Sequence, residues 1–574
     1  GEAADVRFLL PSLFATRRDI PWDEAYDKQY YAVLAHCLAM EDCGLRIVVP
    51  GQQEIWCAYQ EKNIVFDTDE ADRKVFFSRH HPYLAGTEPQ GMSALYACGA
   101  ESVIPSWQKF GRPEGIRIGE GTHICETAFL RLAMANFMGR PRIVIGDHVK
   151  IDAGSTVTAA QRVEIDAGVS IAENVHIKDC RLDDSGLGLS PADREIVAEG
   201  SGVRIERGAC LEENVIVKGS VRIGRGSIVR AGSMVCADIP AYCIAEGSPA
   251  HVTAAFSPKT GKWLPVAGGK ALKKLLAERE KTPPLLTVAF ITYNRSRYLK
   301  RSLTCVLRQI GNDDLTEIIV SDNVSTDDTR VFVEEMQKTY GNLRYCCNEE
   351  NVGAEENIHR AIQKSRGEYV LVSGDDDYFA DGSLHALLTN IVRHRGVALF
   401  YLGNAKVPRC VYRGEGCLQY IGFVSYYMAW ITSVVMRRDL YAHIPEPHRY
   451  DASGIPQIYL QLEMLKQKSD FAVLHGVFFA DDCGDRRPRD YNLAEVFIKN
   501  YFDILTATVK IPAAQLAAEK KRVMEESILP WCQRIKKDHV DLSLEGLFDI
   551  VAAYYGKEPY YAQLVDLLKG IVQG

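Results

Sequence analysis

Aliphatic residues recur at every sixth position over a long central part of the chain. The in-phase positions are Ile145, Ile151 and Val157, then Ile165, Ile171 and Ile177, and then Ile205, Leu211, Val217, Ile223, Val229 and Val235. Glycine, asparagine and aspartate commonly fill the places between them, as in IGDHVKIDAGSTV and IGRGSIVRAGSMV. A short fixed period predicts a solenoid, in which each coil buries its aliphatic side only by stacking on its neighbours.

A different alternation begins near residue 285. Apolar strand-like runs alternate with amphipathic segments of helical spacing, which predicts a parallel, doubly wound sheet. The expected strands start at Leu286, Thr316, Leu343 and Glu368, and the expected helices between them start at Ser296, Ser325 and Glu355. Ser325 or Thr326 is the expected N-cap of the second helix. Ligands of such a sheet bind at the carboxyl ends of its strands.

Polar residues gather at four of these strand ends. The clusters are Thr292 to Arg295, Asp322-Asn323, Asn351 to Gly353, and Asp375 to Asp377. A buried strand cannot hold three unpaired carboxylates, so the aspartates must lie where their strand emerges. Carboxylates there suit a hard divalent cation, Mg²⁺ or Mn²⁺, which prefers oxygen ligands and often binds phosphates as well. An acidic turn is the simpler alternative, but four clusters converging on one crevice favour a site.

The remaining parts of the chain carry weaker signals. Short strands and a helix are expected near the start, a proline-bounded linker with a short basic helix follows the repeats, and the end is helical by pattern. The expected elements near the start are a helix from Asp23 to Met40 and strands at Arg46 to Pro50, Glu54 to Tyr59 and Lys74 to Phe77. We therefore divide the chain into an N-terminal α/β region of unclear type (1–112), the repeats (113–255), a linker (256–284), the doubly wound domain (285–492) and a helical region (493–574).

Composition narrows the functional classes. A chain of 574 residues is too long for one hydrophobic core, and a net charge of −8 offers no basic footprint for nucleic acid. No apolar run reaches the roughly 20 residues that span a bilayer, and the start, GEAADVRFLL, does not read as a secretion signal. The sixteen cysteines show no CxxC pair, which favours reduced thiols. We expect a cytoplasmic protein whose membrane contact is at most peripheral.

The six-residue repeat, over about residues 116–252, resembles the hexapeptide-repeat left-handed parallel β-helix of acyltransferases. Its ending, VCADIPAYCIAEGSPAHV, is similar to the exit of the acetyltransferases in that group that modify nucleosides and sugars. In those enzymes a loop leaving the β-helix supplies a histidine base, whereas the interruption here, KDCRLDDSGLGLSPADREIVAEG, contains no histidine. The resemblance implies a side-by-side homotrimer. We expect a scaffold that serves mainly for oligomerisation, with a bifunctional acetyltransferase/glycosyltransferase as the alternative.

The doubly wound half carries a second resemblance. The segments TVAFITYNR, EIIVSDNVSTDDT, NEENVGAEENIHRAI and GEYVLVSGDDDYF, in this order and spacing, resemble inverting family 2 glycosyltransferases of the GT-A fold. The forms SDNxSTDDT and SxDDDY are closest to the branch similar to abequosyltransferases, and the match covers about residues 285–480. The resemblance implies a nucleotide-diphospho-sugar donor, Mn²⁺ or Mg²⁺ as cofactor, and a glycan, lipid-linked or protein acceptor. A non-catalytic assembly or binding protein is the alternative from another class.

Site residues follow by position from this resemblance. It implies nucleotide-sugar binding by Thr292, Tyr293, Asn294, Arg295, Asp322, Asn323, Gly353, Asn357, Asp375, Asp376 and Trp430, with Ser433 beside the tryptophan. Asp375 and Asp377 form the DxD pair that is expected to bind the metal, although the pattern leaves open which of the three aspartates touches it.

The catalytic base departs from the family pattern. An inverting transferase needs a carboxylate to deprotonate the acceptor, and many members place it in a Glu-Asp pair that opens a helix. Pro456-Gln457 stands at that position here. Asp451 is the nearest preceding acid and the expected base, with Asp481 and Asp482 as rivals. Arg486, Arg487 and Arg489 follow in a polar loop suited to pyrophosphate or simply to solvent.

Overall fold

A computed structural model describes residues 6–9, 13–14, 47–48, 97–99, 102–104, 110–133, 141–184, 190, 194–404, 410–480, 491–538 and 542–572. The chain divides into two compact units, Gly1–Ala254 and Ala255–Gly574. Each unit is described by itself.

The first unit begins with a small three-stranded sheet. Its strands are β1 (Val6–Leu9), β2 (Leu13–Phe14) and β3 (Ile47–Val48), in the order β2-β1-β3. β3 lies inside the strand predicted at 46–50 and pairs in parallel with β1. The helix predicted at 23–40 and the strands predicted at 54–59 and 74–77 lie outside the described residues.

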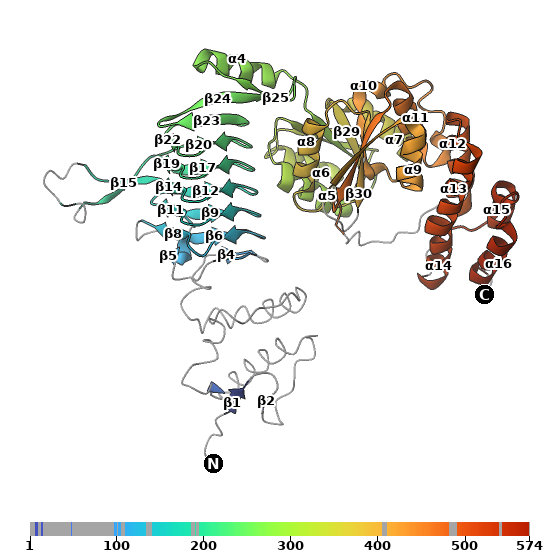
Figure 1. The fold of residues 1–574 in the computed structure, drawn as a ribbon, viewed down its shortest axis with the longest axis horizontal. Helices are drawn as coiled ribbons and strands as arrows, with labels where there is room; N and C mark the ends of the chain where they lie inside the picture. The colour runs from blue at the N-terminus through green and yellow to red at the C-terminus, as the bar shows by residue number, and fades with distance from the viewer. Residues whose placement is uncertain are drawn as a thin grey trace. The chain divides into compact units, whose positions relative to one another are not determined.

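Three sheets, built mainly of short parallel strands, form most of the rest of this unit, and the third continues past its end at Ala254 (Figure 1). One contains β4 (Ala97–Cys98), β6 (Ile116–Ile118), β9 (Ile143–Ile145), β12 (Val163–Ile165), β17 (Val203–Ile205) and β20 (Arg222–Ile223). A second contains β5 (Phe110–Gly111), β8 (Phe129–Leu132), β11 (Thr156–Ala159), β14 (His176–Lys178), β19 (Ile216–Lys218) and β22 (Met234–Val235). The third contains β7 (His123–Ile124), β10 (Lys150–Ile151), β13 (Ser170–Ile171), β18 (Cys210–Leu211), β21 (Ile228–Val229), β23 (Cys243–Gly247), β24 (Ala250–Ser257) and β25 (Lys262–Pro265).

The chain visits the three sheets in turn, so that equivalent positions of successive circuits lie in register. Ile145 pairs with Ile165, and Ile165 pairs with Ile205. All twelve positions of the six-residue repeat are at most 1% exposed, which confirms that the repeat marks the buried side of each circuit. The stacked sheets are compatible with the predicted β-helix, and the hand of its coil stays a prediction. Strands β24 and β25 carry the third sheet into the residues predicted as linker.

A hairpin leaves the stack where the sequence interrupts the repeat (Figure 1). Strands β15 (Cys180–Leu182) and β16 (Ile196–Ala198) pair antiparallel in a two-stranded sheet of their own. At its base the buried carboxylate of Asp179 accepts the backbone N–H groups of Ala160, Gln161 and Arg162 at 2.6 to 2.8 Å. These bonds satisfy the backbone at a corner of the coil, where the strand ladder provides no partners.

The second unit contains an eight-stranded sheet in the order β28-β27-β26-β29-β32-β30-β33-β31. The strands are β26 (Leu286–Thr292), β27 (Thr316–Asp322), β28 (Leu343–Cys347), β29 (Tyr369–Gly374), β30 (Leu399–Asn404), β31 (Cys410–Glu415), β32 (Val434–Arg437) and β33 (Asp470–Gly476). The first four are parallel, as predicted. β32 runs antiparallel to both β29 and β30, so the sheet is mixed beyond this point.

Helices cover both faces of this sheet. Side chains of α5 (Ser296–Ile310), α6 (Thr329–Gln337) and α8 (Ser383–Arg393) belong to one hydrophobic core, and those of α7 (Ala354–Lys364), α9 (Gly416–Val424) and α11 (Pro456–Gln467) belong to the other. Successive residues of β26 alternate between the two, with Val288 in the first core and Ala289 in the second. Helices α4 (Gly269–Glu280) and α10 (Arg438–Tyr441) complete the part before the C-terminal helices.

The start of α6 corrects the predicted N-cap. The helix begins at Thr329, and its N-cap position is Asp328 rather than Ser325 or Thr326. The hydroxyl of Ser325 is engaged by the carboxylate of Asp322, and Val324 has a left-handed φ of 66°, so the chain turns before it enters the helix.

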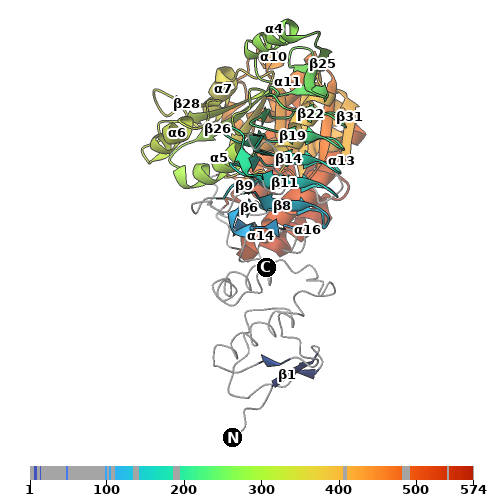
Figure 2. The same cartoon turned by 90° about the vertical axis from the view of Figure 1, so that its left-hand side faces the viewer.

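The C-terminal residues are helical, as predicted. They form a π-helical segment (Glu495–Asn500), α12 (Tyr501–Thr508), α13 (Ala513–Val523), a second π-helical segment (Met524–Ile528), α14 (Leu529–Asp538), α15 (Leu547–Tyr555) and α16 (Tyr561–Val572). α14 and α16 lie side by side (Figures 1 and 2). Tyr501, Leu505 and Leu568 are fully buried and extend the core on the α7 side of the sheet. Among the described helices none combines the length and the apolar character that crossing a bilayer requires.

Candidate active site

The three aspartates follow directly on the end of β29, beside the end of β26. The hydroxyl of Thr292, the last residue of β26, donates to Asp375 Oδ2 at 2.8 Å. Ser302 on α5 donates to the backbone carbonyl of Asp375, also at 2.8 Å. Asp375 is 2% exposed. Two different segments therefore fix the first aspartate in place.

Arg295 joins the first two aspartates. Its Nη2 donates to Asp376 Oδ2 at 2.6 Å, and its Nε lies 3.2 Å from Asp375 Oδ1. Burial raises the pKa of Asp375 to about 7, although the positive charge of Arg295 and the hydrogen bond from Thr292 oppose the rise. The Arg295 contact lacks hydrogen-bond alignment, so Asp375 Oδ1 is a buried oxygen without a hydrogen-bond donor.

Asp377 is held from the other side of β29. Thr432 donates its hydroxyl proton to Asp377 Oδ2, and the same hydroxyl oxygen accepts the N–H of Gly374 at 3.0 Å. The indole Nε1 of Trp430 lies 3.4 Å from Asp377 Oδ2, and its ring packs on Phe479 with centroids 4.5 Å apart. The predicted tryptophan thus lies beside the aspartates.

Thr432 is a contact that the sequence reasoning missed. That reasoning paired Ser433 with Trp430, but the Ser433 hydroxyl donates to the carbonyl of Trp430 at 2.6 Å. Thr432 lies in the same short segment, between Trp430 and Ser433, so the sequence pointed to the right segment but to the wrong hydroxyl.

The oxygen atoms here fit a hard divalent cation. Asp376 Oδ1 and Asp377 Oδ2 each lie 3.1 Å from the place that a Cβ would take on Gly374, so both carboxylates reach over the same glycine. The buried Asp375 Oδ1 is a further oxygen of this group and lacks a hydrogen-bond donor, whereas Asp377 Oδ2 accepts the proton of Thr432. Mg²⁺ and Mn²⁺ favour such oxygen ligands. Asp375 and Asp377 remain the predicted metal ligands. The side chain of Asp376, between them, is 44% exposed.

The second strand end is a closed hydrogen-bonded turn. Asp322 is fully buried, and its carboxylate accepts the N–H and the hydroxyl of Ser325 at 2.9 and 2.6 Å and the phenol proton of Tyr345. Burial, followed by the contact with Asp322, raises the pKa of Tyr345. Asn294 connects this turn to the first strand end, because its side-chain oxygen accepts the N–H of Thr326 at 2.7 Å.

The third strand end is built around asparagines. Asn323 donates to the side-chain oxygen of Asn351 at 2.6 Å and to the carbonyl of Gly353 at 3.1 Å. Gly353 has φ of 85°, a conformation that favours glycine, immediately before α7. The amide of Asn357 exchanges hydrogen bonds with Ser321 at 2.7 and 3.0 Å. These contacts hold the loop in shape, and the roles of Asn323 and Asn357 toward a donor stay predictions.

Tyr293 is a large side chain at this edge and is 45% exposed. Its neighbour Asn294 has a left-handed φ of 51°, which places the residues after β26 in a turn before α5. The predicted donor-binding residues therefore include exposed as well as fully engaged side chains.

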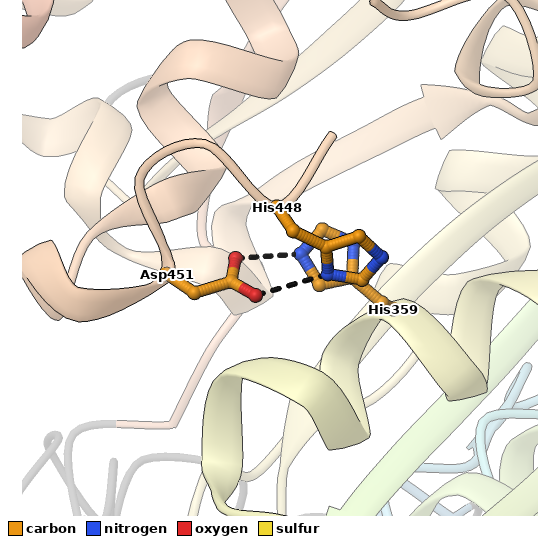
Figure 3. Close-up of side chains that lie close together, drawn as sticks. All are labelled: His359, His448 and Asp451. Atoms are coloured by element: carbon orange, nitrogen blue, oxygen red, sulfur yellow. Dashed lines mark hydrogen bonds and ion pairs between the residues drawn. The ribbon is translucent and has the colours of Figure 1, made fainter. Parts of the chain in front are cut away.

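Asp451 lies in a different constellation from the three aspartates. Its carboxylate lies between two imidazoles, 2.9 Å from His359 Nε2 and 3.0 Å from His448 Nδ1 (Figure 3). Sequence reasoning named Asp451 but missed both histidines. His359 stands on the buried side of a helix that was predicted, and nothing in the pattern pairs it with a residue 92 positions away. Asp481, Asp482 and the three arginines of the polar loop lie outside the described residues.

Comparison with known families and proteins assigns a class to this domain. Residues 287–408 match the model of Glycosyl transferase family 2, and residues 1–80 match that of a glycosyltransferase-like family. The chain therefore contains a family 2 glycosyltransferase domain, whose matched residues include the ends of β26, β27 and β29 and the three aspartates.

Similar proteins belong to two classes. The chain is 23% identical over 207 residues to the abequosyltransferase RfbV of Salmonella typhimurium, an alignment that covers 31% of this chain and 61% of the relative. It is 32% identical over 112 residues to serine acetyltransferase 2 of Arabidopsis thaliana, covering 20% of this chain and 30% of the relative. The structure of S. aureus TarS 1–349 is 18% identical, with a TM-score of 0.36, and the match covers 50% of this chain and 90% of that fragment. The chain thus spans less than two thirds of the length of RfbV and of serine acetyltransferase 2.

Proposed function

We propose that this protein is a metal-dependent glycosyltransferase that moves a sugar from a nucleotide-diphosphate donor to a glycan, lipid-linked or protein acceptor with inversion. The observation that carries the proposal is the convergence of Thr292, Arg295, Trp430 and the three aspartates at the carboxyl ends of adjacent strands. This edge is where a doubly wound sheet binds its ligand, and the domain matches family 2. The fold is proposed to be GT-A.

The chain's own residues position the donor. Asp375 and Asp377 would hold Mn²⁺ or Mg²⁺, and the bound cation would supply positive charge beside the diphosphate leaving group. Thr292 orients Asp375, while Thr432 orients Asp377, so both carboxylates keep fixed directions. Arg295 carries a guanidinium next to them, which suits the phosphate oxygens of the donor.

Nucleotide binding is assigned to the first three strand ends. Tyr293 and Asn294 would border the nucleotide, Asp322 would face its nucleobase, and the loop at Gly353 would approach the nucleotide closely.

Asp451 is our proposal for the residue that accepts the proton of the acceptor hydroxyl, with Asp481 and Asp482 as alternatives. A base of this kind is a carboxylate, and contacts with His359 and His448 hold that of Asp451 in place.

For the first unit we propose a left-handed β-helix that forms a homotrimer. The interruption of the coil is a hairpin without a histidine, and in the acetyltransferases that the repeat resembles a histidine from this place acts as the base. The similarity to serine acetyltransferase 2 favours one second candidate, a bifunctional enzyme that also transfers an acyl group. The test is to incubate the protein with acetyl-CoA and sugar acceptors. Steady release of CoA that is abolished by substituting a histidine of the coil, such as His176, would support that candidate and contradict a purely structural role for the first unit.

Ligand-induced stabilisation tests the proposal. A ligand that binds the native state raises the melting temperature. We expect nucleoside diphosphates and nucleotide sugars of one base to raise the melting temperature of the full chain in the presence of Mn²⁺ and much less after chelation. Equal melting temperatures across a broad nucleotide panel, with and without metal, would favour the non-catalytic assembly or binding protein instead.

A further inference from the structure

Two histidines and an aspartate meet at the side of α7 (Figure 3). His359 comes from α7, whereas His448 and Asp451 come from the turn that precedes α11, three residues apart. One ligand atom from each of the three lies within 4.8 Å of the others, and no other group of three or more His, Cys, Asp or Glu residues in the described part of the chain meets this closely. The three aspartates of the candidate active site do not form such a group.

We propose that this cluster is a binding site for a borderline transition metal of the Zn²⁺ class. Its ligands are His359 Nε2, His448 Nδ1 and the carboxylate of Asp451. Imidazole nitrogen with carboxylate oxygen is a ligand set that Zn²⁺ favours, whereas Mg²⁺ and Mn²⁺ favour oxygen alone. The two metal sites of the protein would thus differ in ligand chemistry, and each would select its own ion.

The surroundings of His359 supply the second contact that metal-bound histidines need. Its Nδ1 lies 2.7 Å from the phenol oxygen of Tyr441, which fixes the ring with Nε2 directed at Asp451. Without metal, Nε2–H of His359 and Nδ1–H of His448 donate to the carboxylate. With metal, each ring would bind through that nitrogen as the neutral tautomer. The proton of His359 then moves to Nδ1, where it donates to Tyr441, and the proton of His448 moves to Nε2.

One side of the cluster is rigid and the other is open. The side chain of His359 is fully buried in a helix that packs on the sheet, whereas those of Asp451 and His448 are 28% and 47% exposed. An ion can therefore enter from the solvent side. Three protein ligands leave a fourth position, and a further carboxylate lies close by, since Glu356 Oε2 is 3.4 Å from His448 Nδ1. Water or Glu356 would complete a tetrahedral shell.

This inference does not rest on the transferase activity. Because Asp451 is one of the ligands, it cannot accept the proton while the site is occupied, and that role then falls to the alternatives already proposed, Asp481 and Asp482. Direct measurement of metal binding separates the two statements, since it requires neither donor nor acceptor.

The test is a calorimetric titration of the chelator-treated full chain with ZnCl₂. We expect saturable binding of one Zn²⁺ per chain at this cluster, and its loss in H448A and in D451N. H443A is the matched control, because His443 is an exposed histidine bonded to the carbonyl of Asp439, and it should bind as the wild type does. D377N should also retain the binding, which separates this site from the aspartates.

Co²⁺ distinguishes the cluster from the cysteines. Co²⁺ bound to thiolates gives a strong near-ultraviolet charge-transfer band, and Co²⁺ on imidazole and carboxylate does not. We expect visible d–d bands without the thiolate band, and their absence in H448A. No saturable binding by the wild-type chain, or unchanged binding in both H448A and D451N, would overturn the proposal. The far-ultraviolet circular dichroism spectra of H448A and D451N should match that of the wild type, which shows that any loss of metal binding is not caused by unfolding.

Discussion

Thr292 and Asp375 join the ends of two neighbouring parallel strands through a hydrogen bond of 2.8 Å between residues 83 positions apart. The bond leaves the buried carboxylate pointing between Thr292 and Arg295 instead of into the apolar core. It is the contact through which the fold of the sheet sets the direction of the first aspartate in the candidate active site.

Removing the Thr292 hydroxyl should therefore destabilise the protein. Thr292→Val keeps the shape of the side chain and leaves a buried carboxylate oxygen without its donor, which costs about 1–3 kcal/mol of unfolding free energy. Urea denaturation measures this loss as a lower unfolding free energy for the transition in which the second unit unfolds. Thr506→Val is the matched control, because Thr506 is exposed and bonds only the carbonyl of Phe502 within its own helix. A loss no larger than that of the control would contradict the account.

Glu519 makes the free energy of unfolding depend on pH. Burial raises the pKa of this carboxyl, although hydrogen bonds from Ser425 and Tyr501, each 2.6 Å long, oppose the rise. The folded chain then binds the proton more tightly than the unfolded chain, so this group's contribution to stability is present below the ordinary pKa and is lost as pH rises through the raised one.

Glu519→Gln should remove that dependence. The amide oxygen can accept both hydrogen bonds and carries no charge, so the stability of the variant relative to the wild type should increase as pH rises from about 4 to about 8. Melting temperatures at a series of pH values measure the trend. Glu525→Gln, at an exposed position of the same helical region, should show no such trend. Parallel pH curves for E519Q and the wild type would speak against a buried, raised carboxyl.

Assembly of the first unit is a separate prediction. If the stacked sheets form a trimerising β-helix, sedimentation equilibrium of the full chain should give three times its mass of 64.0 kDa. The mass should stay constant over a wide range of protein concentration, because interfaces of obligate oligomers are large. A mass of 64.0 kDa at all concentrations would remove oligomerisation as the role of this unit.

The sequence predicts periodic features of this protein well. The six-residue period identified twelve buried positions, because a stacked coil repeats one environment at a fixed spacing. The ends of β26, β27 and β29 were also predicted, since apolar runs stop where polar clusters begin. Both patterns are local and therefore visible without a structure.

Contacts between distant segments could not be predicted in the same way. The antiparallel β32 brings Thr432 to Asp377, although no local pattern distinguishes Thr432 from its neighbour Ser433. The pairing of His359 with Asp451 depends on where the turn before α11 lies against α7. The start of α6 was misplaced because Asp322, at the preceding strand end, engages the side chain that would have capped the helix.

The most direct test of the central claim is metal-dependent release of nucleoside diphosphate from a nucleotide sugar by the wild type, D377N and D566N. Asp566 is an exposed residue of α16 and serves as the matched control. We predict release that requires Mn²⁺ or Mg²⁺, is retained in D566N, and falls by about 100-fold or more in D377N at an unchanged melting temperature. Release by D377N at the wild-type rate, or a wild-type rate unaffected by chelation, would contradict the assignment of the aspartates as the metal and donor site.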